Sequence, residues 1–126
     1  MTYHGSLLVV DDDRHICEAM ADYLRSLGHR TETSLTCRDA MTRMKEFNFD
    51  AVICDVSMPG MSGIEFHRAV AEAAPSMARR VVFVTGGATT PEAAEFLEHT
   101  TNTVLLKPVE YEILRQAVEA ASRQAR

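Results

Sequence analysis

The sequence predicts one α/β domain, built as a doubly wound, five-stranded parallel sheet of strand order 2-1-3-4-5 with helices on both faces. Two observations support this fold class. Short, continuously apolar segments rich in β-branched residues recur along the chain, as expected of parallel strands covered on both faces. Between them lie segments with apolar residues at steps of three and four, typical of amphipathic helices. We assign residues 1–126 to this one domain.

Five segments are predicted to form the sheet. The most apolar ones, Leu7 to Val10, Ala51 to Cys54 and Val81 to Val84, are placed at its centre. The segment from Arg30 to Ser34 is more polar and is predicted to be an edge strand. The segment from Thr103 to Leu106 is predicted to be the fifth strand, at the opposite edge.

Helices are predicted from apolar spacing and from start and stop signals. Thr90 followed by Pro91 is typical of an N-cap and first helical residue, and Gly28 is typical of a C-terminal stop. The predicted helices cover about Ile16 to Leu27, Cys37 to Lys45, Gly63 to Ala74, Thr90 to Glu98 and Ile113 to Ala121.

Composition excludes several classes of function. The net charge is −5 with interspersed cations, which disfavours direct nucleic-acid binding. No apolar run is long enough to span a bilayer, and no signal peptide is recognised at the start, so neither membrane insertion nor secretion is expected. Cys17, Cys37 and Cys54 are odd in number and match no metal-ligand spacing, which indicates reduced thiols in a cytoplasmic protein.

Polar residues follow four of the five predicted strands. Asp11 and Asp12 follow the first strand, Asp55 the third, Thr85 the fourth and Lys107 the fifth. In a doubly wound sheet, ligands bind beyond the carboxyl ends of the strands, where the winding direction reverses. With strands one and three adjacent, we expect their carboxylates to converge at that point.

Each of these features also has a purely structural interpretation. The run from Asp11 to Asp13 could cap a helix, Asp55 could belong to a turn, Thr85 could begin an ordinary loop, and Lys107 could form a surface corner. Their joint occurrence at the correct strand ends favours a functional site.

The segments LLVVDDD, AVICDVSMPGMSGIEF, VVFVTGG and LLKP, in this order, resemble the receiver domain of two-component response regulators. The resemblance covers essentially the whole chain and implies a flavodoxin-like strand order. It implies that Asp55 is the phosphoryl acceptor and that Asp11 and Asp12 form an acidic pair for a divalent metal. It also implies that Thr85 is the switch hydroxyl and Lys107 the phosphate partner.

Charge repulsion supports a metal independently of the family. Two carboxylates about 4 Å apart repel by up to about 4 kcal/mol at an effective dielectric constant of 20, so we expect a cation or protonation to relieve the cluster. An all-oxygen site suits Mg²⁺, with Mn²⁺ as a substitute. The resemblance implies Asp12, Asp55 and the Ser57 carbonyl as direct ligands, with Asp11 acting through water. Asp13 lies outside this set and is predicted to cap the first helix.

The resemblance implies a signalling role rather than turnover of a substrate. The donor would be a phosphohistidine on a sensor histidine kinase or a histidine phosphotransfer domain, and the chain would assist only its own phosphorylation and dephosphorylation. It would be a single-domain regulator or a module of a hybrid kinase or larger regulator. The resemblance also allows a homodimer to form on phosphorylation, and it does not specify the downstream protein target.

Two other classes of function share part of this pattern. A Mg²⁺-dependent phosphatase with an Asp nucleophile would require a second carboxylate at position 57, where this chain has Ser57. A receiver that only binds partners would not need the complete set of phosphorylation residues.

One position departs from the family pattern. Receivers commonly carry an aromatic residue three positions before the lysine of the fifth strand, where this chain has Val104. A short, stiff valine cannot replace a mobile ring. We therefore expect activation to depend mainly on the loop after Thr85, where Gly86 and Gly87 permit backbone conformations that other residues avoid, and on the helix that follows.

Overall fold

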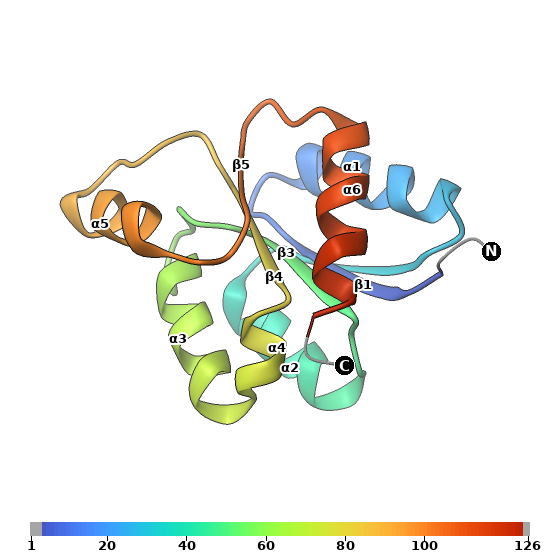
Figure 1. The fold of residues 1–126 in the computed structure, drawn as a ribbon, viewed down its shortest axis with the longest axis horizontal. Helices are drawn as coiled ribbons and strands as arrows, with labels where there is room; N and C mark the ends of the chain where they lie inside the picture. Colours follow the sequence, from blue (N-terminus) through green and yellow to red (C-terminus); the bar gives the residue numbers. More distant parts are fainter. Residues whose placement is uncertain (1–3, 125–126) are drawn as a thin grey trace.

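A computed structural model describes residues 4–124, which form a parallel sheet covered by helices on both faces (Figure 1). The strands are β1 (Ser6–Val10), β2 (Arg30–Ser34), β3 (Ala51–Asp55), β4 (Val81–Thr85) and β5 (Val104–Leu106). The helices are α1 (Arg14–Ser26), α2 (Cys37–Glu46), α3 (Gly63–Ala73), α4 (Pro75–Ala78), α5 (Pro91–His99) and α6 (Tyr111–Ser122).

The strand order is β2-β1-β3-β4-β5 and every pairing is parallel, which confirms the predicted fold class. The three segments placed at the centre lie there, and the polar strand β2 and the short strand β5 form the two edges. Thr103, which we expected to begin the last strand, precedes it instead, since that strand starts at Val104.

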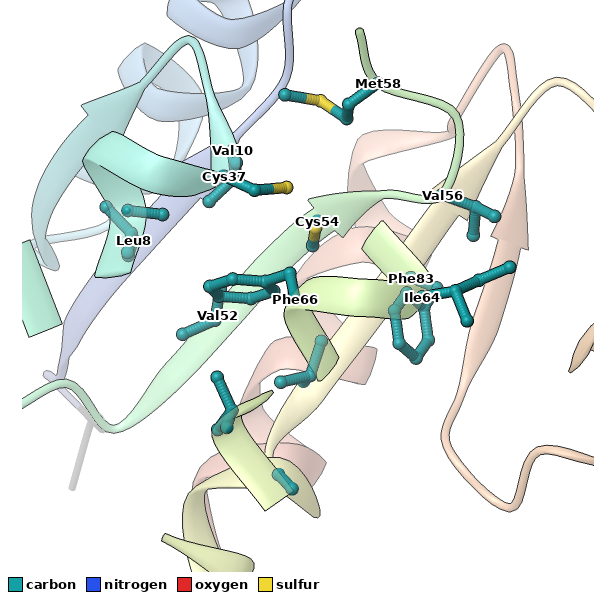
Figure 2. Close-up of a cluster of buried hydrophobic side chains, with 14 of the residues drawn as sticks. Leu8, Val10, Cys37, Val52, Cys54, Val56, Met58, Ile64, Phe66 and Phe83 are labelled. Atoms are coloured by element: carbon teal, nitrogen blue, oxygen red, sulfur yellow. The ribbon is translucent and has the colours of Figure 1, made fainter. Parts of the chain in front are cut away.

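Alternation along the strands divides the core into two clusters. Leu8, Val52, Cys54 and Phe83 lie on the face covered by α2, α3, α4 and α5. Figure 2 shows these strand residues beside Cys37 of α2 and Phe66 of α3. The neighbouring strand residues, such as Ile53, pack on the other face against α1 and α6. Because side chains alternate with a period of two, a fully apolar strand supplies both clusters at once.

The helix boundaries follow the capping signals. The side chains of Asp13, Thr36, Ser62 and Thr90 each accept a hydrogen bond from the backbone three residues on, at the starts of α1, α2, α3 and α5. This confirms the predicted capping role of Asp13. Gly28 follows α1 with a φ of 96°, a conformation that favours glycine.

Short helix α4 was not predicted from the sequence. Proline disfavours helical geometry in the residue before it, and Ala74 has a φ of −150° and a ψ of 79°, so α3 ends there. Pro75 then begins a new turn, in which its missing N–H is harmless. The expected helix from Gly63 to Ala74 is therefore followed by a second one before β4. Within residues 4–124, no helix is both long enough and apolar enough to cross a membrane.

Candidate functional site at the carboxyl ends of the strands

The predicted site residues come together at the carboxyl edge of the sheet. Asp11 and Asp12 directly follow β1, Asp55 ends β3, and Thr85 ends β4. Lys107 follows β5, and its backbone N–H donates to the Thr85 carbonyl over 2.8 Å, which extends the pairing of these strands past the last residue of β5. Strand order and parallel pairing alone therefore place all five residues at one edge.

Three carboxylates meet in this site. Asp11, Asp12 and Asp55 each have a carboxylate oxygen within 4.8 Å of the other two. Asp11 and Asp55 are buried, with exposed fractions of 1% and 6%, whereas Asp12 is exposed. Within the described part of the chain, these residues are the only group of at least three His, Cys, Asp or Glu side chains with this spacing.

Local backbone contacts fix the two buried carboxylates. The Asp13 N–H donates to Asp11 Oδ1 over 2.9 Å, and the Ser57 N–H donates to Asp55 Oδ1 over 3.1 Å. Both are contacts to a backbone N–H two residues further on, which hold the carboxylate in place without a further side chain. In each residue the second oxygen, Oδ2, is directed to Lys107.

Lys107 joins the ends of β1 and β3. Its Nζ lies 2.9 Å from Asp11 Oδ2 and 3.0 Å from Asp55 Oδ2, and it donates a hydrogen bond to the latter. The expectation that only a bound cation or protonation could relieve the repulsion was therefore incomplete, because the lysine supplies one positive charge. One ammonium against three carboxylates still leaves two negative charges.

Burial and Lys107 have opposite effects on the pKa of Asp55. Burial raises the pKa of Asp55 above its ordinary value, although the hydrogen bond and attraction from Lys107 lower it in part. Burial acts to lower the pKa of Lys107, but its carboxylate partners Asp11 and Asp55 outweigh burial and raise it. The lysine is therefore held in its charged form beside the acceptor.

The donor set fits a hard divalent cation. Asp11 Oδ2 is buried, and the Lys107 ammonium 2.9 Å away is the one partner that the described residues give it. A buried carboxylate oxygen with unused accepting capacity, grouped with two other carboxylates, suits Mg²⁺ or Mn²⁺. The exposure of Asp12 leaves the site open on its solvent side.

The Thr85 hydroxyl is bound to the loop that follows it. Thr85 Oγ1 donates to the Gly87 carbonyl over 3.2 Å and accepts from the Gly87 N–H over 3.1 Å. Gly87 has a φ of 121°, which favours glycine, whereas Gly86 adopts no such conformation. Of the two glycines in this loop, only Gly87 adopts a backbone conformation that other residues avoid.

One residue of the site was missed by the sequence analysis. A Cβ at Gly63 would lie 2.3 Å from the Asp55 carbonyl oxygen and 2.9 Å from Val56 Cα, closer than packed atoms can approach. The Gly63 N–H also donates to the Val56 carbonyl over 2.9 Å. Glycine therefore lets α3 begin directly against the end of β3. The signal was a glycine just after the capping residue Ser62, which we used only to start a helix.

Comparison with known proteins identifies relatives of this chain. The family model described as response regulator receiver domain matches residues 7–119. The transcriptional regulatory protein ZraR of Salmonella typhimurium is 29% identical over 95% of this chain, and the sensor histidine kinase RcsC of the same organism is 31% identical over 95%. The match spans 27% of ZraR and 12% of RcsC, so the chain corresponds to a small part of each.

Solved structures of the same architecture include the chemotaxis response regulator CheY4 of Vibrio cholerae. It is 28% identical, with a TM-score of 0.80, and the alignment covers 94% of this chain and 99% of CheY4. The likeness therefore extends over nearly the whole of both chains.

Proposed function

This chain belongs to the response regulator receiver domain family, and on that premise we propose that it accepts a phosphoryl group on Asp55 from a phosphohistidine of a sensor histidine kinase or a histidine phosphotransfer domain. We assign all 126 residues to one receiver. The observation that carries the proposal is the Lys107 ammonium, which lies about equally close to the buried carboxylates of Asp11 and Asp55.

The reaction is an in-line transfer. One oxygen of Asp55 attacks phosphorus, the bond from phosphorus to the donor nitrogen breaks, and an acyl phosphate forms. Lys107, already at Asp55 Oδ2, is positioned to neutralise charge on the incoming phosphoryl oxygens. The Asp55 carboxylate loses its negative charge when it forms the anhydride bond to phosphorus, but it gains an anionic phosphoryl group, so the lysine keeps an anionic partner.

The metal belongs to the same site. Asp11, Asp12 and Asp55, with the Ser57 carbonyl, would hold Mg²⁺, or Mn²⁺ in its place, which supplies positive charge to the transferring phosphoryl oxygens. Asp12 and Asp55 would be direct ligands and Asp11 would act through water. The two negative charges that Lys107 leaves uncompensated support a divalent ion there.

The output of the site is a change in partner binding. To donate to a phosphoryl oxygen, the Thr85 hydroxyl must release the Gly87 carbonyl, which shifts the loop between β4 and α5. This loop leads into Thr90, whose side chain caps α5. Phosphorylation would therefore alter the surface around α5, which a downstream protein or a second copy of the chain reads. The domain acts as a cytoplasmic signalling module, and it catalyses only its own phosphorylation and dephosphorylation.

Intact-mass measurement tests this proposal. The chain is incubated with Mg²⁺ and acetyl phosphate, a small acyl phosphate that can replace the protein donor. A mass gain of one phosphoryl group that alkaline hydroxylamine removes supports an acyl phosphate. Turnover of simple phosphate esters without a labelled chain would instead indicate a phosphatase, and no gain with any phosphodonor would contradict the proposal.

A further inference from the structure

Two cysteines lie together in the core beside the phosphoryl acceptor. Cys37 is the first residue of α2 and Cys54 the last but one of β3, and both are buried, with exposed fractions of 1% and 0%. Figure 2 shows the Cys37 side chain reaching from the helix toward Cys54 on the strand. Both belong to the same buried cluster, and each thiol is the largest influence on the pKa of the other. Neighbouring thiols on two elements can be joined once the sulfurs approach to about 2.05 Å.

The pair is directly connected to the acceptor residue. Cys54 precedes Asp55 in β3, and its Sγ also lies 3.2 Å from the Asp55 carbonyl oxygen, as a donor. If the Cys54 sulfur is drawn toward Cys37, this contact is lost and the end of the strand must adjust. The Asp55 carbonyl is also the atom against which Gly63 packs, so there is little free space to absorb the change.

We propose that Cys37 and Cys54 are a reversible redox modification site, whose disulfide slows phosphoryl transfer to Asp55. The effect on transfer rests on the proposed function. The oxidant class is a peroxide. The Cys37 sulfur attacks one peroxide oxygen and becomes a sulfenic acid with release of one water. The Cys54 thiol then displaces the hydroxyl as a second water, so two thiols and one hydrogen peroxide give one disulfide and two waters.

The position of Cys37 suits it to the attacking role. It lies at the start of a ten-residue helix, where the helix dipole favours a thiolate. The neighbouring Cys54 thiol acts in the same direction and lowers the pKa of Cys37. Reaching either sulfur requires a local opening of the first turn of α2, because both are buried.

The third cysteine provides a matched control. Cys17 is equally buried but lies on the other face of the sheet, in α1. Its sulfur donates to the backbone carbonyls of Val9 and Ser34, and burial raises its pKa to about 11. Cys17 is therefore surrounded by backbone acceptors instead of a second thiol, and we expect no disulfide from it.

Peptide mapping tests the covalent step without reference to phosphorylation. The wild-type chain and the variants Cys17→Ala, Cys37→Ala and Cys54→Ala are treated with hydrogen peroxide and digested without reductant. We expect a cross-linked Cys37–Cys54 peptide, two hydrogen masses below the sum of its halves, in wild type and Cys17→Ala only. Cys37→Ala and Cys54→Ala each remove one thiol of the pair from a different element, so one serves if the other does not fold. Absence of this peptide in folded wild type would overturn the proposal.

The functional step is measured on the same samples. We expect the rate of labelling by acetyl phosphate to fall at least tenfold in oxidised wild type and Cys17→Ala, and dithiothreitol to restore it, because a displacement of about 1 Å at a reacting group can slow a reaction about a hundredfold. Cys37→Ala should keep its rate after peroxide, which also controls for methionine oxidation. An oxidised chain that labels at the reduced rate would overturn the regulatory step. If reduced wild type does not label at all, the proposed function fails, while the mapping result stands separately.

Discussion

Replacing Gly63 by alanine should disturb both the stability of the domain and its acceptor. The new Cβ would lie 2.3 Å from the Asp55 carbonyl oxygen, whereas packed atoms stay at about 3.4 Å or more, so α3 and the end of β3 must separate by roughly 1 Å. Both contacting atoms belong to the backbone and cannot rotate away. Overpacking of this kind costs about 1 to 3 kcal/mol. Removing a glycine from the helix returns about 0.5 to 1 kcal/mol.

The midpoints of these two ranges leave a net loss of about 1 kcal/mol in the free energy of unfolding. For a chain of this size, each kcal/mol lowers Tm by about 4 °C, so Gly63→Ala should melt about 4 °C below wild type. A shift of the Asp55 carbonyl also moves the carboxylate, so labelling by acetyl phosphate should slow by about tenfold or more. Thermal unfolding followed by circular dichroism, with intact-mass labelling, measures both effects.

Gly86→Ala is the matched control. A Cβ at Gly86 meets nothing within 4 Å, and its backbone does not require glycine, so this variant should stay within about 0.5 kcal/mol of wild type. The reasoning is refuted if Gly63→Ala is as stable as Gly86→Ala and labels at the same rate.

Asp12→Ala should weaken Mg²⁺ binding about tenfold or more, because Asp12 is expected to bind the metal directly. Asp13→Ala should instead cost about 1 kcal/mol of stability through the lost helix cap and leave Mg²⁺ binding nearly unchanged. Equal losses of Mg²⁺ affinity in a metal titration would reject this division of roles. Burial lowers the pKa of His67 below 6.5 in the folded chain, so the unfolded chain binds the proton more readily. The free energy of unfolding should therefore fall as the pH drops from 6.5 through the folded pKa. Urea unfolding should show a smaller fall in His67→Gln, and an equal fall in the two proteins would contradict this. Hydrogen exchange with and without beryllofluoride should change across residues 86–92, and a change confined to the strand around Val104 would contradict the loop as the switch.

Strand prediction was successful because burial on both faces leaves a simple signal. The central strands are continuously apolar, and each leads to a residue of the site, so their order was enough to place Asp11, Asp55 and Thr85 at one edge of the sheet. Helix capping was predictable for a similar reason, because the side chains of Asp13 and Thr90 accept hydrogen bonds from backbone N–H groups only three residues away. Such features depend on few neighbours and are therefore visible in a single sequence.

What the sequence could not provide depends on contacts between distant elements. The need for glycine at position 63 arises from the Asp55 carbonyl, eight positions earlier, and a pattern of helix signals does not contain that distance. The direct ion pairs of Lys107 with two carboxylates likewise depend on the position of its side chain relative to the ends of two other strands. Of the two adjacent glycines after β4, only Gly87 adopts a positive φ. The Thr85 hydroxyl forms hydrogen bonds with the carbonyl and the N–H of this residue, and these bonds depend on the folded loop.

The most direct test of the account is whether Asp55 itself carries the phosphoryl group. Wild type and Asp55→Asn are incubated with Mg²⁺ and acetyl phosphate and compared by intact mass over time. We predict that wild type gains one hydroxylamine-labile phosphoryl group, whereas Asp55→Asn gains none, because an amide is a much poorer nucleophile than a carboxylate. Circular dichroism verifies that the variant is folded. Labelling of Asp55→Asn at the wild-type rate would contradict the central claim.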